Sequence, residues 1–322
     1  MDRLPVAVIG VGHLGRFHAL KYRDNPEANL VGVFDVDPDR ARAVAEEAGT
    51  EAVHDLAALI ARVKAVSVVT PTFTHYDVVR QCLEANVHVL VEKPFTATLA
   101  QADELIELQK ARQLVLAVGH LKRLQPAIEH LRSLNLGSPR YIEAERLAPF
   151  KPRSLDVDVI MDLMIHDLDL ALHLSGSACT DLRAVGVPVV TDKLDMANAW
   201  LDFDNGAVGT FASSRVVRET SRKLRLFWQD AYASIDFAAN GLSISRRRPD
   251  ASGGMIPGIE TSLVDLPKVD VLAREIDNFL SAVTRGDRLF CDAQDGRAAL
   301  DLALRIQKTT LDRFHAGLSI KD

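Results

Sequence analysis

The segment VDVIMDLMIHDLDLALHL, residues 157–174, carries six titratable side chains in an otherwise apolar stretch. Successive residues of an α-helix lie about 100° apart, so five of the six fall within an arc of roughly 80°. The five are Asp158, Asp162, His166, Asp169 and His173, whereas Asp167 points elsewhere. A helix that is apolar around the rest of its circumference is buried. Its titratable stripe then faces a cavity, a metal or a partner, unless it forms a solvent-exposed polar edge.

Asp162 and His166 stand one helical turn apart in this stripe. A carboxylate at that spacing can orient an imidazole and stabilise its protonated form, which is the arrangement of a general acid–base pair. Asp158, Asp162 and His166 could alternatively bind a metal, but we expect no metal site. Asp169 and His173 fit a contact edge between domains better than a catalytic role.

A second set of residues, Gly10-Val11-Gly12-His13-Leu14-Gly15, follows an apolar run and precedes a helical pattern. Glycines in this context let the backbone approach a pyrophosphate, which the helix N-terminus attracts with its amides and dipole. Asp35 ends the next strand 20 residues after Gly15, where a carboxylate accepts hydrogen bonds from an adenine ribose. Asp35 and Asp37 would repel the 2′-phosphate of NADP, so we expect NAD, with Arg40 nearby as the one opposing sign. A Rossmann-like sheet without a cofactor is the alternative.

The first 120 residues must position this turn, and they alternate short β-branched runs with amphipathic stretches. Continuous apolar strands that alternate with helices are typical of a parallel sheet covered on both faces. We therefore expect a Rossmann dinucleotide-binding domain over residues 1–121. Thr98 and Gln101 indicate a capping box for one of its helices. The expected strands are 6–10, 30–35, 65–70, 87–92 and 114–119, and the expected helices are 13–23, 38–48, 74–85 and 98–112.

After about residue 122 the pattern becomes that of an α+β domain with a large, mostly antiparallel sheet, expected over residues 122–322. Asn205-Gly206 predicts a β-hairpin between two strand-like runs. The final helix could pack back on the first domain. The expected strands are 140–147, 180–190, 196–203, 207–216, 222–229 and 232–237, and the expected helices are 123–137, 270–285 and 293–316.

The composition is that of a globular protein, with 322 residues, 48% hydrophobic and 25% charged. A net charge of −6 argues against a nucleic-acid or anionic-membrane binder. Three widely spaced cysteines fit a reducing compartment better than a disulfide framework. The N-terminal apolar run is too short for a membrane span and lacks a signal-peptide pattern. We expect a cytoplasmic protein.

Glu92-Lys93-Pro94 ends the strand at 87–92, at the edge where ligands bind in open α/β sheets. A plain surface lysine is the alternative for Lys93. Together, VAVIGVGHLG, Asp35, VEKP and Asp162-xxx-His166 occur in the order and spacing of the glucose–fructose oxidoreductase, inositol dehydrogenase and MocA family. The chain resembles this family over nearly its whole length.

The resemblance implies a Rossmann domain, a second domain with a large antiparallel sheet, and oxidation of sugar or cyclitol hydroxyls with NAD(P). It maps the catalytic set onto Lys93, Asp162 and His166, with His166 as the base and Lys93 as the partner of the reacting oxygen. Many members have glycines before this helix, where the chain reads DVDVIMD, so we expect the shape of the site before Asp162 to differ from theirs. Further cofactor contacts are expected from Thr70, Pro71, His75, Glu92 and Lys93.

Two basic segments suggest an anionic substrate, because the protein is acidic overall. Scattered surface charges are the alternative. The segments GHLKRLQP and RLAPFKPRS, together with the titratable helix, also resemble the branch of the family that oxidises the 3-hydroxyl of UDP-N-acetylglucosamine. The expected substrate contacts are Lys93, His120, Arg123, Arg146, Lys151, Arg153, Asp162 and His166.

In that branch the 3-keto sugar passes to an aminotransferase, which yields 3-amino sugars for lipid A or another surface polysaccharide. The family resemblance also implies a homodimer or homotetramer that pairs through the open face of the second-domain sheet. Two other functions stay open. One is a dehydrogenase of a free inositol or hexose, and the other is an NAD(H)-sensing regulatory protein.

Overall fold

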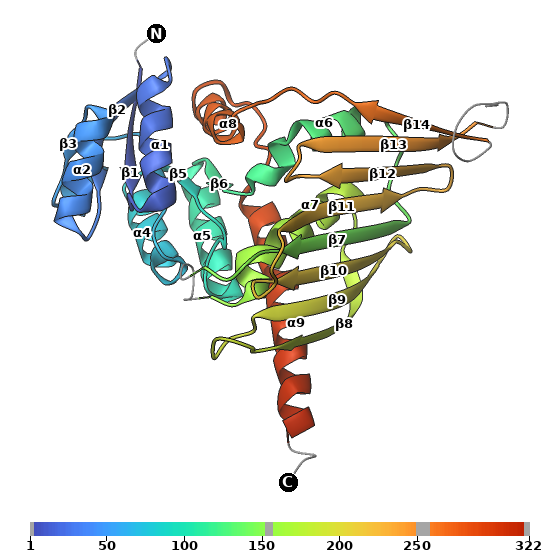
Figure 1. Cartoon of the computed structure of the whole chain (residues 1–322). Coiled ribbons are helices and arrows are strands. Elements are labelled where there is room, and N and C mark those ends of the chain that lie inside the picture. Colours follow the sequence, from blue (N-terminus) through green and yellow to red (C-terminus); the bar gives the residue numbers. More distant parts are fainter. Residues whose placement is uncertain (1–2, 152–156, 249–257, 319–322) are drawn as a thin grey trace. The chain divides into compact units, whose positions relative to one another are not determined.

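The computed structural model describes residues 3–151, 157–248 and 258–318 (Figure 1). The chain divides into two compact units. The first comprises Met1–Leu124 and Asp270–Arg297, and the second comprises Gln125–Val269 and Ala298–Asp322. Within the described residues, no helix is both long and apolar enough to cross a lipid bilayer. Each of the three cysteines is buried as a free thiol.

The first unit contains a six-stranded parallel sheet in the order β3-β2-β1-β4-β5-β6. The strand order reverses between β1 and β4, which is where doubly wound folds bind dinucleotides. The expected Rossmann sheet is confirmed, and β3 and α3 are additions to it. The strands are β1 (Leu4–Ile9), β2 (Ala28–Phe34), β3 (Glu51–Ala52), β4 (Ala65–Val68), β5 (His88–Val91) and β6 (Leu116–Val118). The helices are α1 (His13–Asp24), α2 (Pro38–Ala48), α3 (Leu56–Ile60), α4 (Thr72–Glu84), α5 (Leu99–Arg112), the 3₁₀ turn η1 (Leu121–Leu124) and α8 (Val271–Arg285).

Capping residues mark the ends of α2 and the start of α5. Asp37 caps α2 through the amides of Asp39 and Arg40, and Gly49 ends it in the left-handed conformation. The capping box of Thr98 and Gln101 is present at the start of α5.

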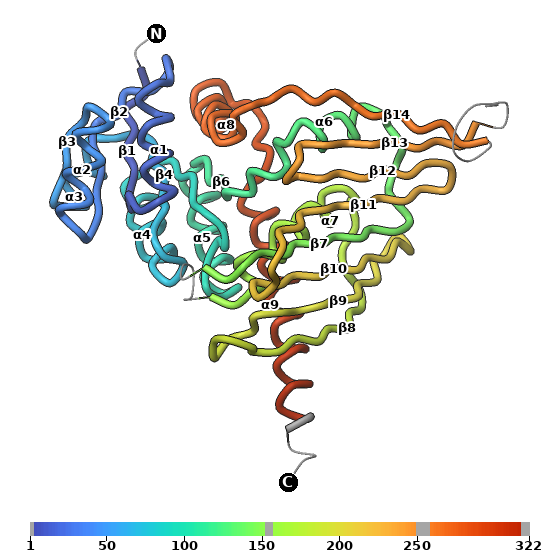
Figure 2. The backbone as a smooth tube through the Cα atoms, in the orientation of Figure 1, coloured from blue at the N-terminus to red at the C-terminus, as the bar shows by residue number. Residues whose placement is uncertain are grey.

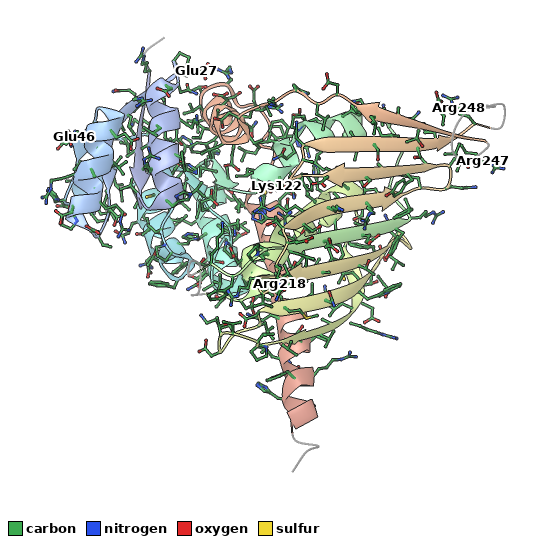
Figure 3. The ribbon with its side chains drawn as sticks, viewed as in Figure 1. Glu27, Glu46, Lys122, Arg218, Arg247 and Arg248 are labelled. Atoms are coloured by element: carbon green, nitrogen blue, oxygen red, sulfur yellow. The ribbon has the colours of Figure 1, made fainter. Side chains whose placement is uncertain are left out.

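Helix α8 belongs to the core of the first unit although it lies far along the chain (Figure 2). Ile276, Phe279 and Leu280 are buried in the same cluster as Val8 and Val33 of the parallel sheet. Arg285 at the end of α8 forms an ion pair of 2.6 Å with Glu27. Glu27 precedes β2 and is labelled in Figure 3.

The second unit contains an eight-stranded sheet in the order β14-β13-β12-β11-β7-β10-β9-β8. All neighbours are antiparallel except β7 and β10. The expected mostly antiparallel sheet is therefore confirmed, and Asn205-Gly206 closes the β9–β10 hairpin as predicted. The strands are β7 (Tyr141–Leu147), β8 (Cys179–Val187), β9 (Met196–Phe203), β10 (Val208–Ser214), β11 (Ser221–Phe227), β12 (Ala231–Asp236), β13 (Gly241–Arg247) and β14 (Ile259–Val264). The helices are α6 (Pro126–Ser133), the π-helix η2 (Ile160–Met164), α7 (Ile165–Ser175) and α9 (Ala293–Leu318), whose first residues belong to the first unit.

Two expectations about the helices were wrong in detail. The helix expected over 123–137 is split into η1 and the shorter α6, because Pro126 occupies the first position of α6 and cannot continue the preceding turn. The helix expected over 157–174 is not α-helical throughout, because its first part is the π-helix η2. Strands β13 and β14 are additions to the expected sheet.

Candidate active site

The turn between β1 and α1 can be formed only with glycines at two positions. Gly10 has a φ of +85°, and a Cβ there would lie 2.7 Å from the carbonyl oxygen of Val69. A Cβ on Gly15 would lie 1.9 Å from the carbonyl oxygen of Gly10. Beside Gly12, by contrast, a Cβ would meet nothing within 4 Å. The backbone is thus packed on its inner side and open on its outer side.

The N-terminus of α1 is suited to an anion. Gly12 is the N-cap and offers no side chain to the first-turn amides, so no cap of the chain's own covers those donors. A helix end of this kind attracts a pyrophosphate through its amides and its dipole. The expected roles of His13 and Leu14, the first two helical residues, follow from their backbone positions.

Asp35 is held in place by the glycine turn. One of its carboxylate oxygens accepts the amide of Val11 at 2.9 Å, and the other accepts the amide of Asp37 at 2.9 Å. Arg40 lies 3.6 Å from Asp35 and 3.0 Å from Asp37, so two carboxylates already neutralise this cation. The Arg40 amide, with its guanidinium, holds the pKa of Asp37 below its ordinary value. This concentration of negative charge favours a ribose hydroxyl over a 2′-phosphate.

His75 joins two loops at the ends of β4 and β5. Its ring is buried, with Nε2 2.8 Å from the carbonyl oxygen of Thr70 and Nδ1 2.9 Å from that of Pro94. Burial lowers the pKa of His75, and a neutral ring donates to one of these carbonyls. His75 therefore supports the loop of Thr70 and Pro71 from inside, which differs from the direct cofactor contact expected for it.

Lys93 follows β5, and the peptide bond between Lys93 and Pro94 is cis. Its amide donates to the side chain of Glu92 at 3.1 Å. The Glu92 side chain turns inward and lies 3.4 Å from Nε2 of His18. The Glu92 side chain is thus occupied in the interior of the first unit, and the cofactor contact expected from Glu92 stays a prediction.

Asp162 and His166 flank the junction of η2 and α7. Asp162 lies in the π-helix, His166 lies in the first turn of α7, and both are half-buried. Single π turns inside α-helices occur often at functional sites, because they shift the side chains that follow. The even stripe expected from a regular α-helix is therefore corrected. Asp169 is fully buried, whereas His173 is half-buried.

Asp158 is a structural residue rather than a member of the stripe. One of its oxygens accepts the amides of Ile160 and Met161 at 3.0 Å, and the other accepts Nε2 of Gln307 at 2.7 Å. Both oxygens are thus occupied at the start of the helix. This arrangement argues against the metal site considered for Asp158, Asp162 and His166.

A buried ion pair fixes the chain just before η2. Asp195 accepts the side chain of Arg215 at 2.8 Å and three backbone amides from the loop 189–191. Arg215 also donates to the carbonyl oxygen of Val157 at 3.1 Å. Burial acts to raise the pKa of Asp195, but the three amides and Arg215 outweigh it and hold the pKa well below its ordinary value. The pair thus anchors the entry to the Asp162 segment.

Two arginines expected to contact the substrate are themselves buried and form ion pairs with carboxylates of the chain. Arg146 of β7 binds Asp167 of α7 through Nε at 2.8 Å, and only 4% of Arg146 is exposed. Arg123 is 3% exposed and lies 2.9 Å from Asp295, whose side chain is 40% exposed. Both expectations are corrected, because a buried guanidinium paired with a carboxylate of its own chain is not available to a diphosphate.

The remaining basic residues of the expected substrate set differ in environment. His120 follows β6 and is buried, whereas Lys151 is exposed. Arg153 lies outside the described residues. Asp167 points away from the rest of the stripe, as the helical spacing predicted, and its partner is Arg146.

Sequence reasoning missed the residues that surround Glu92. His18 and Tyr22 of α1, Ser67 of β4 and Glu275 of α8 are buried polar groups of the first unit. A signal existed on α1, where His18 and Tyr22 lie one turn apart on the face that packs inward. Nothing in the local sequence around Glu275 distinguishes it from an ordinary acidic residue on an amphipathic helix.

Comparisons with known proteins agree with this geometry. Residues 4–120 match the family model described as an oxidoreductase family with an NAD-binding Rossmann fold, and residues 125–233 match the GFO/IDH/MocA C-terminal domain. The UDP-N-acetylglucosamine 3-dehydrogenase of Acidithiobacillus ferrooxidans is 54% identical over 95% of this chain and 97% of its own length. Its solved structure superimposes with a TM-score of 0.90 at 52% identity, over 96% of this chain and 98% of that one.

More distant relatives share the whole length. The myo-inositol 2-dehydrogenase of Thermotoga maritima is 28% identical over 94% of this chain and 95% of its own. A levoglucosan dehydrogenase solved with NADH has a TM-score of 0.84 at 19% identity, over 97% of this chain and 98% of that one, which is a likeness of fold.

Proposed function

We propose that the chain, which belongs to the GFO/IDH/MocA family of NAD-binding oxidoreductases, oxidises the 3-hydroxyl of UDP-N-acetylglucosamine with NAD. The product is the 3-keto sugar nucleotide. One observation carries the choice of substrate, namely the 54% identity to a UDP-N-acetylglucosamine 3-dehydrogenase over almost the full length of both chains. The inositol dehydrogenases that also match are far less similar, at 28% identity for the one from Thermotoga maritima.

The proposed chemistry assigns each of three side chains one task. His166 takes the proton of the reacting hydroxyl, and Asp162 stabilises the imidazolium that results. Lys93 donates a hydrogen bond to the same oxygen while negative charge develops on it. NAD, when bound, supplies the acceptor for the hydride that leaves the carbon.

The diphosphate of the substrate needs cationic partners, and ion pairs within the protein exclude two of the expected arginines. Arg123 and Arg146 are withdrawn because carboxylates occupy them. Lys151, Arg153 and His120 remain the proposed contacts. The segment RLAPFKPRS connects β7 to the Asp162 helix, so a phosphate held there would be close in sequence to the catalytic pair.

The proposed product has the chemistry of an aminotransferase substrate, because a ketone on the sugar ring can be converted into an amine. The enzyme would then supply 3-amino sugars for lipid A or another surface polysaccharide. UDP-sugars are made in the cytoplasm, which is the proposed location. We also propose a homodimer or homotetramer, for which the open face of the eight-stranded sheet is the candidate interface.

The deciding experiment gives the purified protein NAD and either UDP-N-acetylglucosamine or free N-acetylglucosamine. NADH absorbance should rise with the nucleotide sugar, and the product mass should fall by two hydrogens. The kcat/KM for the UDP conjugate should exceed that for the free sugar and should decrease as salt rises, because screening weakens exposed charge attraction. Comparable kcat/KM values for the two would return a dehydrogenase of a free inositol or hexose to first place. Binding of NAD without turnover of any alcohol would favour a regulatory protein.

A further inference from the structure

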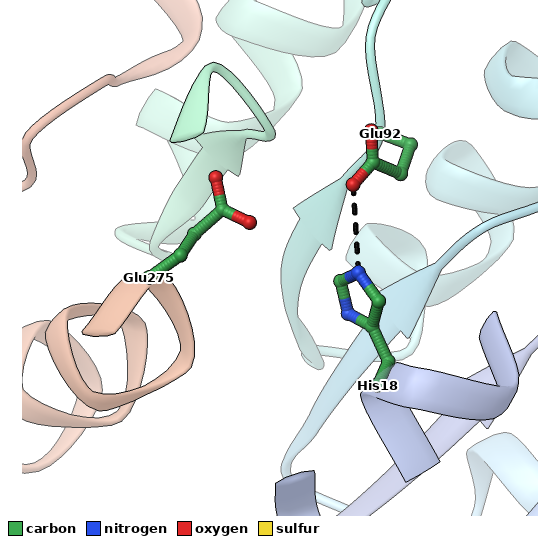
Figure 4. A group of neighbouring side chains, drawn as sticks. All are labelled: His18, Glu92 and Glu275. Carbon is green, nitrogen blue, oxygen red and sulfur yellow. Dashed lines mark ion pairs between the residues drawn. The ribbon is translucent and has the colours of Figure 1, made fainter. Parts of the chain in front are cut away.

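Three buried titratable residues of the first unit lie close together (Figure 4). His18 comes from α1, Glu92 follows β5, and Glu275 comes from α8, with their nearest ligand-type atoms all within 4.8 Å of one another. His18 is 0% exposed, and Glu92 and Glu275 are each 7% exposed. Figure 4 shows the Glu275 carboxyl directed toward the other two side chains. Elements far apart in sequence therefore deliver these groups to one enclosed place.

The outer atoms of this cluster lack ordinary hydrogen-bond partners among the described residues. They are Nε2 of His18, Oε1 of Glu92 and Oε2 of Glu275. Burying polar atoms without partners is costly, and burying two ionised carboxylates side by side is costlier still. The cluster must therefore contain a proton or a cation that offsets one of the two negative charges.

The charge of the two carboxyls differs according to their surroundings. Burial raises the pKa of Glu275 well above its ordinary value, and the negative charge of Glu92 raises it further. Burial opposes ionisation of Glu92 as well, but His18 and then Lys93 outweigh that effect and lower the pKa of Glu92. These opposite directions favour Glu92 as the anion and Glu275 as the neutral acid.

A chain of polar groups lies behind Glu92. The hydroxyl of Tyr22 lies 2.9 Å from Oγ of Ser67, which lies 3.1 Å from Nδ1 of His18. Nε2 of His18 lies 3.4 Å from Oε1 of Glu92. When Ser67 donates to Nδ1, the neutral ring carries its proton on Nε2, on the side of Glu92.

Glu92 links these groups to Lys93. Its second carboxylate oxygen accepts the Lys93 amide at 3.1 Å. The other side of the carboxylate packs against Gly119, where a Cβ would lie 2.9 Å from the carboxyl carbon of Glu92. The carboxylate is therefore confined between a histidine, a backbone amide and a glycine.

We propose that His18, Glu92 and Glu275 form a buried positioning site for Lys93, in which Glu275 stays protonated so that Glu92 alone bears the charge that faces the lysine. This role rests on the proposed function of Lys93. The three residues act through Lys93 and touch neither the reacting hydroxyl nor the hydride acceptor. An ionised Glu275 would repel Glu92 and disturb its hold on the Lys93 amide. The titratable groups that act on the cluster are Tyr22 on α1, His75 on α4 and Lys93 beyond β5.

The kinetic test compares Glu92→Gln with the matched control Asp277→Asn, which alters an acidic residue two positions after Glu275 on the same helix. Glu92→Gln should reduce kcat roughly ten- to a hundredfold, the scale of a misplaced catalytic group, while NAD affinity stays within about twofold. Glu92→Asp, which restores a carboxylate, should recover part of the lost kcat, a rescue that a purely structural role would not require. Asp277→Asn should retain the wild-type kcat. An unchanged kcat in Glu92→Gln would overturn the proposal.

A second measurement needs neither substrate nor cofactor. The infrared spectrum of the wild type at neutral pH should contain a carboxylic-acid carbonyl band that Glu275→Gln removes and Asp277→Asn leaves in place. Its absence from the wild type would contradict a protonated Glu275, even if Glu92→Gln failed to fold.

Because the same three side chains are possible ligands for a divalent cation, elemental analysis of the purified protein is the third measurement. One bound divalent cation per chain that is lost in Glu275→Gln would show that a metal, rather than a proton on Glu275, offsets the charge of the two carboxylates. That result would overturn the proposal. Lys93→Met with normal turnover would instead refute the proposed function.

Discussion

At the scale of single residues, the two groups proposed to act on the hydroxyl, Lys93 and His166, are held in place by different structural features. The backbone amide of Lys93 is held by a buried carboxylate, whereas His166 lies one residue after the junction of a π-helix with an α-helix. A short backbone displacement at either place would move a reacting group out of hydrogen-bond distance. The proposed mechanism therefore predicts large effects from small changes at these two positions.

His166→Asn should lower kcat by about 10²–10⁴-fold, because asparagine keeps a polar side chain but cannot take the hydroxyl proton. Lys93→Met, which keeps an unbranched stem and removes the charge, should also lower kcat. NAD binding, followed by fluorescence, should be retained in both variants. His173→Asn, seven residues further along the same helix, is the matched control and should cost much less. Near-normal turnover in His166→Asn would show that the titratable stripe is structural.

The role of a residue could be predicted from the sequence where it depends on neighbouring residues. The prediction failed where a residue distant in the sequence binds the side chain. Gly10 and Gly15 were predicted correctly as turn glycines, because the strand–turn–helix context is contained within a few residues. Arg146 and Arg123 were assigned to the substrate, but Asp167 and Asp295 occupy them. The partner of Arg123 lies on α9, and no pattern near Arg123 reveals it.

At the scale of elements, the segment that carries Asp162 is defined by its anchors as much as by its own helical propensity. Asp158 caps its first amides, Gln307 of α9 holds Asp158, and Arg215 holds the carbonyl of Val157. Capping signals and the Asn205-Gly206 hairpin could be predicted from the sequence, because each depends on neighbouring residues. The π-helix could not, since an apolar run of this length fits either helical pitch.

Removing the charge of Asp195 should destabilise this framework. Asp195→Asn leaves Arg215 buried without its anionic partner, which costs about 3–5 kcal/mol and lowers the melting temperature on the order of 10 °C. The pKa of Asp195 is held below its ordinary value, so its stabilising charge is present above about pH 4 and is lost as pH falls further. The difference between wild type and variant should therefore be full at neutral pH and shrink in acid. Thermal melts at both pH values check this, with the exposed Asp192→Asn as control; equal melting temperatures at neutral pH would refute it.

At the scale of the whole molecule, one face of the eight-stranded sheet remains open in the described structure. Along β7, buried Ile142 and Ala144 alternate with Tyr141, Glu143 and Glu145 on the other face. That face contains a groove of about 390 Å³ lined by Trp200, Val185, Arg183 and Arg313, among others. Trp200 is 45% exposed and Val185 is 51% exposed. A large, partly apolar surface that includes an exposed tryptophan is typical of a protein–protein interface.

The proposed homo-oligomer makes this face testable. Light scattering after size exclusion should give a dimer or tetramer for the wild type. Trp200→Glu should shift the distribution toward monomer, because a central aromatic residue contributes at least about 2 kcal/mol at an interface hot spot and a buried charge in its place adds a desolvation cost. Phe73→Glu is the matched control, since Phe73 is 68% exposed but belongs to the first unit, and it should leave the mass unchanged. A monomeric wild type would refute the proposed oligomer. An oligomer that tolerates Trp200→Glu and dissociates with Phe73→Glu would place the interface elsewhere.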